Sequence, residues 1–593
     1  MKEQSVKTTS MMTRWGREID PEHVLDQYPR PEMVRENYLN LNGLWDYAIT
    51  GSAEFPQMFD GKSLVPFSPE APLSGVNRIL QPDEYLHYER TITVRKEEQV
   101  RYLLHFGAVD QTCEVYVNGE KAGEHTGGYL AFSIDITAWL RDGGNRLHVT
   151  VRDLSDTSFH AKGKQSLDRG GMWYTPQSGI WQTVWMERVP SCYIRELKVT
   201  PDYDRSSILL RIILNTGEEI PARAVVRYRG ETLQVKQGMT SATLRIGPLP
   251  VHPWTPETPD LYDLAIQAGE DEITSYCAMR KISMEKDSRG ILRLFLNGRP
   301  YYQNGVLDQG YYPDGLYTAP SDEAMVNDIL QMKRLGFNML RKHIKIEPSR
   351  WYYHCDRLGM LVWQDMVCGG EPYHSWFVTY MPNLFPFTGR IIRDRSRRLF
   401  SRKQEEGRNE FLREVKQTIR QLYHHPSIVL WTAFNEGWGQ FDARKVTKLI
   451  RRLDPSRLID EASGWFDQGG GDLYSIHNYF RKLRISPCRT RCAALTEFGG
   501  YSYHIPGRSF TEEEYGYGKY HSKDELTGAI EKLWRRDLLS NIPRGLSASV
   551  YTQVSDIEDE TNGLLTYDRE EVKVDAERIR KVNEELGKIF EAS

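Results

Sequence analysis

Between about residues 40 and 190, hydrophobic and polar residues alternate in short runs that are separated by turn-forming residues. Successive side chains of a β-strand point to opposite faces, so this period of two predicts strands with one buried face. An Asn-Gly pair at 118–119 separates two runs and predicts a tight hairpin. Many short strands with glycine-rich turns are typical of a β-sandwich or jelly roll. The clearest runs are Tyr88–Val94, Tyr102–Phe106, Cys113–Val117 and Arg146–Val151.

A second group of alternating runs, from about residue 191 to 283, predicts a smaller β-sandwich of the immunoglobulin type. The proline-rich stretch VHPWTPETPDLY at residues 251–262 interrupts these runs. Because proline cannot donate to a strand ladder, this stretch is predicted to be a loop. The runs are Ile194–Val199, Ile208–Leu214, Ala222–Tyr228, Ala242–Ile246 and Tyr262–Ala268.

After Asn297-Gly298 the pattern changes, and short apolar runs alternate with stretches of helical period. Ser321–Leu335, for example, begins with a helix-capping serine and acidic residues and ends before Gly336. Eight strand candidates alternating with helices predict a (β/α)8 barrel, the TIM barrel fold, although the helix after the sixth strand has only a weak pattern. The strand candidates are Tyr301–Val306, Asn338–Leu340, Leu361–Trp363, Ile428–Phe434, Leu458–Asp460, Tyr474–His477, Ala493–Thr496 and Ser547–Tyr551. The further helix candidates are Ser349–Leu358, Asn409–Tyr423, Arg444–Leu453 and Glu525–Leu539.

These patterns divide the chain into three predicted domains. A chain of 593 residues is too long for a single hydrophobic core, so several domains are expected. We place an N-terminal jelly roll at residues 1–190, an immunoglobulin-like sandwich at 191–284 and a TIM barrel at 285–593. The barrel is the part expected to carry catalysis, because barrels of this type place polar residues at one open end.

Charge and cysteine content limit the partners of the protein. Lysine and arginine number 77 against 81 aspartates and glutamates, a net charge of −4, so no basic field is available to collect nucleic acid. The seven cysteines are odd in number and scattered, which is typical of reduced thiols in the cytoplasm. The first residues, MKEQSVKTTSMMTRW, lack the apolar segment of a secretory signal, and no apolar run is long enough to span a bilayer. We therefore expect a cytoplasmic protein without nucleic-acid or membrane partners.

Two glutamates follow apolar runs of the predicted barrel. Glu436 comes just after the fourth strand candidate, and Glu497 comes just after the seventh. In a TIM barrel the active site lies at the carboxyl ends of the strands, so both side chains are expected at one opening. A single glutamate at such a position is more often a helix cap or an ion-pair partner. A pair across one opening, with polar and aromatic companions, favours catalysis.

Such a pair is what glycoside hydrolysis requires. One carboxylic acid protonates the leaving oxygen, and one carboxylate attacks the anomeric carbon. In enzymes that retain configuration the two carboxyl groups are about 5–5.5 Å apart. The negative nucleophile also raises the pKa of the acid by like-charge repulsion, until glycosylation removes that charge. Oxygens more than about 9 Å apart would exclude this mechanism.

Several segments resemble glycoside hydrolase family 2, the β-galactosidase and β-glucuronidase superfamily. HHPSIVLWTAFNEGWGQ (424–440) is similar to the acid/base segment of that family, and LTEFGGY (495–501) is similar to its nucleophile segment. YPRPEMVRENYLNLNGLWDY (28–47) and SGIWQTVWMERVP (178–190) resemble its N-terminal sugar-binding domain. The resemblance implies a retaining exo-β-glycosidase with Glu436 as general acid/base and Glu497 as nucleophile.

The resemblance also implies roles for residues around the two glutamates. Asn435 would bind the sugar 2-hydroxyl, Tyr479 would donate to the nucleophile, and Arg341 would lower its pKa. From the residues alone, Asp308 could equally cap a turn, Arg341 could form a structural ion pair, and Trp363 could belong to the core. The other residues expected to bind the substrate are His343, Asp308, Trp363, His477, Trp465 and Asn562.

The choice of sugar rests on the strand-eight loop DETNGLLTYDR (559–569). Glucuronidases of the family carry an Asn-x-Lys before the matching glycine, whereas this chain has Glu560, Thr561 and Asn562. The lysine is absent, and the acid would repel a uronate. Asn562 directly before Gly563 is similar to the galactosidase pattern, so we expect terminal β-D-galactosides, together with the related α-L-arabinopyranosides.

Two alternatives stay open. The first is a β-glycosidase of the same family with another sugar, such as a β-glucuronidase, a glucosidase or a mannosidase. The second is a non-catalytic carbohydrate-binding protein on the same scaffold. No metal and no cofactor are expected, because the metal-binding positions of the large galactosidases have no clear match here. The expected partner is a glycoside or oligosaccharide, and the resemblance favours a homo-oligomer.

Overall fold

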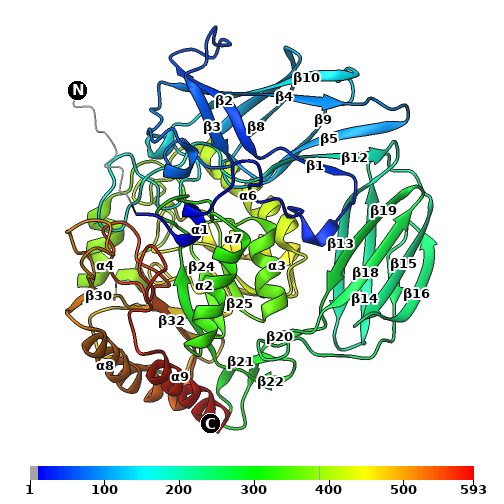
Figure 1. Cartoon of the computed structure of the whole chain (residues 1–593). Coiled ribbons are helices and arrows are strands. Elements are labelled where there is room, and N and C mark those ends of the chain that lie inside the picture. Colours follow the sequence, from blue (N-terminus) through cyan, green and yellow to red (C-terminus); the bar gives the residue numbers. More distant parts are fainter. Residues whose placement is uncertain (1–10, 386–387, 593) are drawn as a thin grey trace.

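Two antiparallel sheets packed face to face form the first part of the chain (Figure 1, blue to cyan). The computed structural model describes residues 11–385 and 388–592. One sheet has six strands, namely β3 (Gly61–Val65), β2 (Gly43–Thr50), β4 (Tyr85–Val94), β10 (Gly143–Arg152), β7 (Thr112–Val117) and β8 (Glu120–Thr126) in that order. The other has four, namely β1 (Tyr38–Asn40), β12 (Val184–Pro190), β5 (Val100–Phe106) and β9 (Phe132–Asp135).

The β7–β8 hairpin shows how the sequence produces this arrangement. Buried and half-buried side chains alternate along β7, as a strand with one face on the core requires. At the turn, Asn118 and Gly119 have φ angles of 55° and 89°, the left-handed conformation that a two-residue hairpin loop needs. The buried faces of both sheets share one core, to which Trp45 and Tyr88 of one sheet and Phe106 of the other belong. The predicted sandwich is confirmed.

A smaller sandwich of seven strands follows (Figure 1, right). Its core joins the inner faces of both sheets through residues such as Ile212, Val226 and Leu264. Trp254 of the predicted proline-rich loop is fully buried, and its indole N–H donates to the Asp356 carbonyl at 2.7 Å, which ties this sandwich to the barrel. The sheets are β13 (Ile194–Asp202), β14 (Ser207–Leu214) and β17 (Leu244–Ile246), and β16 (Glu231–Met239), β15 (Pro221–Tyr228), β18 (Tyr262–Ala268) and β19 (Asp271–Cys277).

Eight parallel strands form the barrel that the sequence predicts. All except β28 are buried along their whole length, which explains their continuous apolar runs. The hydrogen-bonded order begins at β27 and ends at β28, so the barrel is closed except between these two strands. In order the strands are β27 (Leu458–Asp460), β26 (Ile428–Thr432), β25 (Leu361–Asp365), β24 (Met339–Lys342), β23 (Gln303–Asp308), β32 (Leu546–Thr552), β29 (Cys492–Gly499) and β28 (Leu473–Asn478).

Helices cover the barrel on all sides but one. Within the described residues, the connections after β27 and β28, at 461–472 and 479–491, contain no helix, so the expected eight βα repeats are six. The first of these connections is only about as long as the shortest parallel crossover and is rich in glycine, which leaves no room for a helix. The main helices are α2 (Asp322–Arg334), α3 (Ser349–Leu358), α6 (Glu405–Leu422), α7 (Ala443–Leu453), α8 (Lys523–Leu533) and α9 (Ala576–Glu591). Shorter helices are α1 (Arg14–Arg17), α4 (Met381–Leu384) and α5 (Thr388–Ile391).

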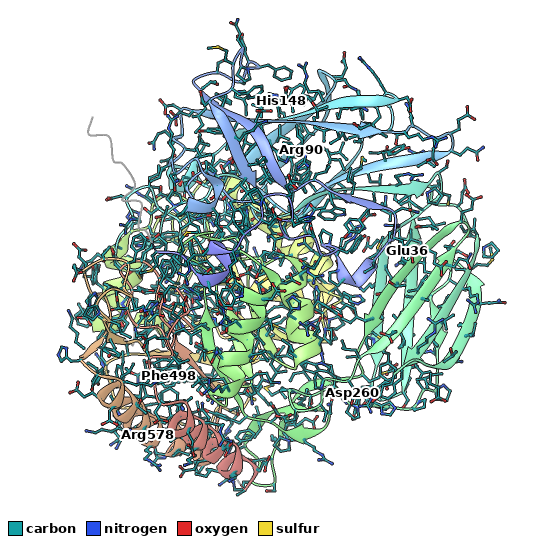
Figure 2. All side chains as sticks on the ribbon, viewed as in Figure 1. Glu36, Arg90, His148, Asp260, Phe498 and Arg578 are labelled. Carbon is teal, nitrogen blue, oxygen red and sulfur yellow. The ribbon has the colours of Figure 1, made fainter. Side chains whose placement is uncertain are left out.

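Alternation along β29 separates the functional face of the barrel from its packing face. Glu497 points into the barrel, whereas Phe498 points outward and packs on Trp534 and Tyr551, with ring centroids 5.1 and 5.8 Å apart. Figure 2 shows Phe498 among the densely packed side chains above α8 and α9, while Arg578 of α9 lies near the surface.

One end of the barrel is closed by a small antiparallel sheet. This sheet, β20 (Ile282–Lys286), β21 (Leu292–Leu296) and β22 (Arg299–Pro300), lies below the barrel in Figure 1. Leu294 of β21 belongs to the same hydrophobic cluster as Met339, Leu361 and Leu473, the first residues of three barrel strands. Within the described residues, the amino-terminal end of the barrel is therefore filled, and the open end is at the carboxyl ends of the strands.

A long connection of the first sandwich reaches that open end. We call residues 153–178, between β10 and β12, the 153–178 segment. The backbone N–H of Lys162 donates to the Cys368 carbonyl of the barrel at 2.9 Å. Further along the segment, the hydroxyl of Tyr174 donates to Glu560 after β32. The segment therefore forms part of the wall of the opening.

The remaining observations bear on location. None of the helices in the described ranges is long and apolar enough to cross a membrane. All seven cysteines are free thiols. Residues 1–10, on which most of the prediction about a secretory signal rests, lie outside the described residues.

Candidate active site

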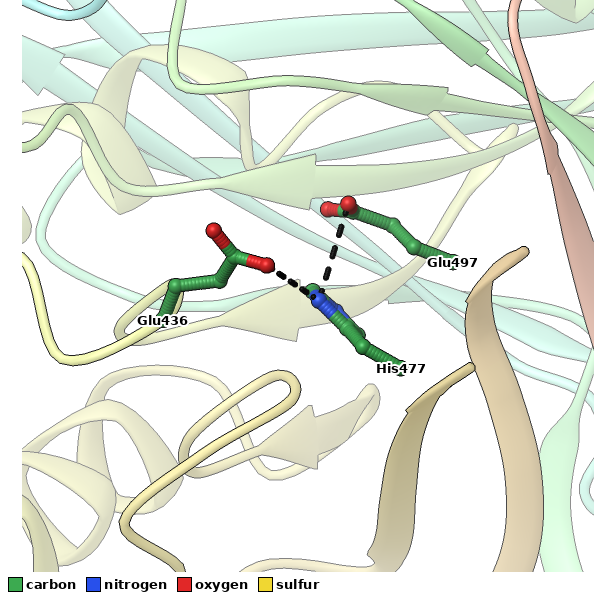
Figure 3. Close-up of side chains that lie close together, drawn as sticks. All are labelled: Glu436, His477 and Glu497. Atoms are coloured by element: carbon green, nitrogen blue, oxygen red, sulfur yellow. Dashed lines mark hydrogen bonds and ion pairs between the residues drawn. The ribbon is translucent and has the colours of Figure 1, made fainter. Parts of the chain in front are cut away.

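The two predicted glutamates face each other across the open end of the barrel (Figure 3). Glu497 lies near the end of β29, and Glu436 follows β26 in a left-handed conformation with φ 48°. The N–H of Glu436 donates to the Ser463 carbonyl at 2.9 Å, which fixes this turn against the strand-five loop. Carboxylate oxygens of the two glutamates lie within 4.8 Å of each other. This close approach of one oxygen from each side chain fits the separation of about 5–5.5 Å between the carboxyl groups of retaining glycosidases.

Glu497 is held as an anion. One of its oxygens accepts from Arg341 Nη1 at 3.0 Å, and the other accepts from the Tyr479 hydroxyl at 2.6 Å. Burial alone would raise the pKa of Glu497, but His477 and Arg341 lower it to about 2. Burial and the charge of Glu497 raise the pKa of Tyr479 well above its usual value, so the hydroxyl stays a donor. A carboxylate in this state is ready to act as a nucleophile.

Arg341 organises the floor of the site. The side chain is fully buried, and it donates to both oxygens of Asp365 at 3.0–3.1 Å and to Asn435 Oδ1 at 2.8 Å. Asp365 also lies 2.9 Å from His343 Nδ1. Burial alone would raise the pKa of Asp365, but Arg341 and His343 lower it. Strands β24, β25, β26 and β29 are thus joined by one charged network under the two glutamates.

His477 lies between the glutamates. Its Nδ1 is 2.8 Å from Glu436 Oε1 and 3.5 Å from Glu497 Oε2, and its Nε2 is 3.0 Å from the Ser463 hydroxyl. The side chain is fully buried, so Ser463 fixes the ring orientation. His477 was expected to bind substrate, and the structure brings it against both glutamates.

Three buried donors around Glu436 have no hydrogen-bond partner within the described part of the chain. They are Asn435 Nδ2, Trp438 Nε1 and Trp465 Nε1. Buried donors are normally satisfied, so each of these is a group that a ligand oxygen would satisfy. Sugar hydroxyls are such acceptors. Trp465 also packs edge-on against His477, with ring centroids 5.3 Å apart.

Two further predicted residues are near the site but already have partners. Asp308 is 2.9 Å from Lys342 Nζ and accepts from the Gly310 N–H at 2.9 Å. Asn562 accepts from Gln553 Nε2 at 2.8 Å and is almost fully buried. Both therefore support the wall of the site through partners of their own.

Trp363 is not brought to the site. It is fully buried in the cluster that fills the closed end of the barrel, and its indole N–H donates to Gln303 at 2.6 Å. Asp365 lies two residues further along β25, which puts Trp363 about 6–7 Å deeper than the layer that carries the charged network. This position corresponds to the core alternative for Trp363.

Some residues of the site were not predicted. Asp365 ends β25 and could have been found by the strand-end argument that identified the glutamates. Trp438 lies in the segment 424–440, two residues after Glu436, but no role was predicted for it. Lys164 and Tyr174 come from the 153–178 segment, and no local pattern indicates that this segment covers the barrel opening.

The ligand atoms of Glu436, His477 and Glu497 all lie within 4.8 Å of one another, so these residues could hold a divalent metal. Two carboxylates and an imidazole suit Zn²⁺. A metal there would occupy the space between the two glutamates that the anomeric carbon needs. The absence of a metal requirement stays a prediction.

Two family models match the chain. The model described as "Glycosyl hydrolases family 2, TIM barrel domain" matches residues 292–481. The model described as "Glycosyl hydrolases family 2, sugar binding domain" matches residues 77–190. Together they span just over half of the chain.

Curated relatives are distant and longer than the matched region. A β-galactosidase of Leuconostoc mesenteroides is 25% identical over 398 residues, which covers 62% of this chain and 34% of that protein. A protein of Formosa agariphila is 24% identical over 408 residues, which covers 62% of this chain and 43% of that protein. The match thus spans less than half the length of either relative.

Solved structures of similar fold include enzymes that act on acidic sugars. A β-glucuronidase of an uncultured Clostridium has a TM-score of 0.73 at 18% identity, covering 93% of this chain and 99% of that one. A β-galacturonidase of Eisenbergiella tayi, solved with galacturonate, has a TM-score of 0.70 at 18% identity, covering 94% and 100%. At such identities these similarities establish the fold alone.

Proposed function

This chain belongs to glycoside hydrolase family 2, and from that premise we propose that it is a retaining exo-β-glycosidase. The observation that carries the proposal is the distance between Glu436 and Glu497. Their oxygens lie within 4.8 Å, so one anomeric carbon can be reached by both side chains. The proposed roles are nucleophile for Glu497 and general acid/base for Glu436.

In the first step, a Glu497 oxygen attacks the anomeric carbon while the bond from that carbon to the leaving oxygen breaks. Glu436 transfers its proton to the leaving oxygen, so the aglycone departs as a neutral alcohol. Arg341 and Tyr479 hold the Glu497 carboxylate in place through its two oxygens. The unpartnered amide N–H of Asn435 is proposed to bind the 2-hydroxyl, a contact that strengthens in the transition state.

In the second step, water hydrolyses the glycosyl-enzyme. Esterification has removed the charge of Glu497, and Glu436, now a carboxylate, takes a proton from the water. The water oxygen attacks the anomeric carbon and releases the Glu497 carboxylate. Two inversions at the same carbon give net retention. His477, 2.8 Å from Glu436, is proposed as the residue that positions the acid/base.

For the sugar, we propose the galacto configuration, as the strand-eight loop indicates. Terminal β-D-galactosides and α-L-arabinopyranosides are the neutral candidates. Asn562 is proposed to act through its contact with Gln553, because that contact holds the loop that faces the sugar. The free thiols favour a reducing compartment, so we propose the cytoplasm as the location.

The mechanism is tested with the Glu497→Gly variant and azide. Removal of the carboxylate leaves space below the anomeric carbon, so azide can attack there while Glu436 protonates the leaving group. We expect loss of hydrolysis in the variant and recovery with azide, giving the α-glycosyl azide. Glu461→Gln is the matched control, because Glu461 is also buried at a barrel strand end and accepts from the Gly470 N–H. This control should keep turnover without azide.

Two results would overturn the proposal. One is the absence of turnover of any p-nitrophenyl β-glycoside by the unmodified chain, which would favour a carbohydrate-binding protein. The other is a β-configured azide product from the Glu497→Gly variant, because it would place the nucleophile on the other face of the sugar.

A further inference from the structure

Lys164 is a buried cation at the wall of the site. It belongs to the 153–178 segment, and only 7% of its surface is exposed. Its ammonium lies 5.6 Å from the ring of Tyr174 and 5.7 Å from the ring of Trp438. Trp438 follows the proposed acid/base Glu436 by two residues, so Lys164 approaches a ring of the acid/base turn.

Among the described residues, no carboxylate forms an ion pair with Lys164, and no acceptor takes a hydrogen bond from its ammonium. The other buried lysines differ. Lys342 and Lys345 are bound to Glu347 at 2.7 and 2.8 Å, and Lys573 is bound to Asp556 at 2.7 Å. Lys162, two residues away, donates to the Asp156 carbonyl at 3.4 Å. Burial of a charge without a partner is unfavourable, and an anionic group from outside the chain would provide one for Lys164.

Two acidic side chains that contact the 153–178 segment from the strand-eight loop are already engaged. Glu560 accepts from the Tyr174 hydroxyl and from Gln553 Nε2 at 2.7 Å. Glu558 accepts from the Thr175 N–H at 3.1 Å. Both carboxylates therefore have donors of their own, and neither forms an ion pair with Lys164.

The position of Lys164 relative to His343 links it to the sugar pocket. Burial lowers the pKa of His343, and the charge of Lys164 lowers it further. The His343 ring is 6.3 Å from that of Trp438, the same ring that Lys164 approaches. His343 and Lys164 therefore both approach the Trp438 ring, whose own N–H is one of the buried donors without a partner.

We propose that Lys164 binds an anionic group on the sugar that this site cleaves, so the natural glycone is acidic. The charged group is the carboxylate of a uronic acid or a sulfate ester on a galactose. This inference rests on the proposed function and refines it, since it adds a charge to the galacto-configured sugar. It replaces only the part of the strand-eight argument that excluded a charged sugar, because Lys164 of the 153–178 segment takes the place of the missing lysine; the indication of the galacto configuration from Asn562 is kept.

The test compares binding and turnover of charged and neutral sugars. Binding of D-galacturonate, D-glucuronate, galactose 6-sulfate and D-galactose to the whole chain is measured by calorimetry, and kcat/KM is measured for the matching p-nitrophenyl β-glycosides. The variants are Lys164→Met, which keeps the apolar stem, and Lys164→Arg, which keeps the charge. Lys162→Met is the matched control, since Lys162 is equally buried and lies over the Tyr373 ring.

We expect Lys164→Met to weaken binding and kcat/KM of the acidic sugar by about 100-fold, the usual loss when one partner of a buried charge pair is removed. Lys164→Arg should recover most of this loss, and the neutral sugar and the Lys162→Met control should change by less than about threefold. A preference for the sulfate over both uronates identifies the sulfate ester as the anion.

Equal effects of Lys164→Met on charged and neutral sugars would overturn the inference, as would tighter binding of galactose than of every charged sugar. These failures differ from failure of the proposed function. If no glycoside is hydrolysed, the calorimetric comparison still decides whether Lys164 selects an anion. If neutral galactosides are hydrolysed and Lys164 has no effect on charge preference, the glycosidase proposal stands without the acidic glycone.

Discussion

Removal of the Tyr479 hydroxyl should move the titration of the nucleophile into an observable range. That hydroxyl donates to Glu497 at 2.6 Å inside a buried site, and a hydrogen bond to a charged group contributes about 1.5–3 kcal/mol. Since one pKa unit corresponds to about 1.4 kcal/mol, loss of this bond should raise the pKa of Glu497 by about one to two units. Starting from about 2, the new value is about 3–4.

The assay is the pH dependence of kcat/KM for an activated aryl glycoside, measured from pH 3.5 to 8. In the parent protein the Glu497 carboxylate is ionised over this whole range, so this group contributes no loss on the acid side. In Tyr479→Phe its protonation at low pH should remove activity below about pH 4. Unfolding measured at each pH separates this effect from acid denaturation.

Tyr517→Phe is the matched control. Its ring stacks on Tyr479 at a centroid distance of 4.3 Å, so this variant changes a neighbouring hydroxyl without removing the bond to Glu497. Superimposable profiles for Tyr479→Phe and the parent protein would refute the assigned role of this hydrogen bond. An equal shift in Tyr517→Phe would refute its specificity.

Three other predictions concern the acid/base, metal binding and stability. Glu436→Gln should slow hydrolysis of substrates with poor leaving groups by about 10²–10⁴-fold and spare activated aryl glycosides, and equal losses for both would contradict the acid role. Zn²⁺ should inhibit competitively through Glu436, His477 and Glu497, whereas chelation should leave activity intact, and activity restored by added metal would disprove this. Arg35→Met should destabilise the protein by about 3–5 kcal/mol, because it leaves Asp271 buried without its ion-pair partner and weakens the pairing of Glu187; an unchanged midpoint in urea would contradict this estimate.

The barrel and its two glutamates were predictable because their signals are local. A strand buried on both faces reads as a continuous apolar run, and the polar residue that ends the run lies at the open end of the barrel. The prediction that Trp363 binds the substrate was wrong because this residue lies too deep in the barrel. Residues two apart on a strand point to the same side, so the pattern correctly predicted that Trp363 points into the barrel. It could not predict how far from the open end the side chain lies, and this distance is what separates Trp363 from Asp365.

The contribution of Lys164 and Tyr174 was not predictable from local pattern. Both belong to a connection between sandwich strands, and they reach the site only through packing of that connection on the barrel. The same limit applies to the missing helices. The alternation of apolar runs with helical stretches indicates a parallel barrel. The absence of a helix from two connections depends on the length and glycine content of those connections, and the pattern of the strands does not reveal it.

The division of the pocket between two distant parts of the chain has a consequence for how its selectivity can change. The groups proposed to break the glycosidic bond lie on or just after barrel strands, whereas the 153–178 segment adds a side wall from outside the barrel. Under the proposed function, substitutions in that wall should alter which sugars fit without disturbing the proposed catalytic groups. Related chains can thus differ in substrate specificity while the catalytic chemistry stays the same. Grafting the 153–178 segment between homologues is a direct way to exchange their specificity for the sugar.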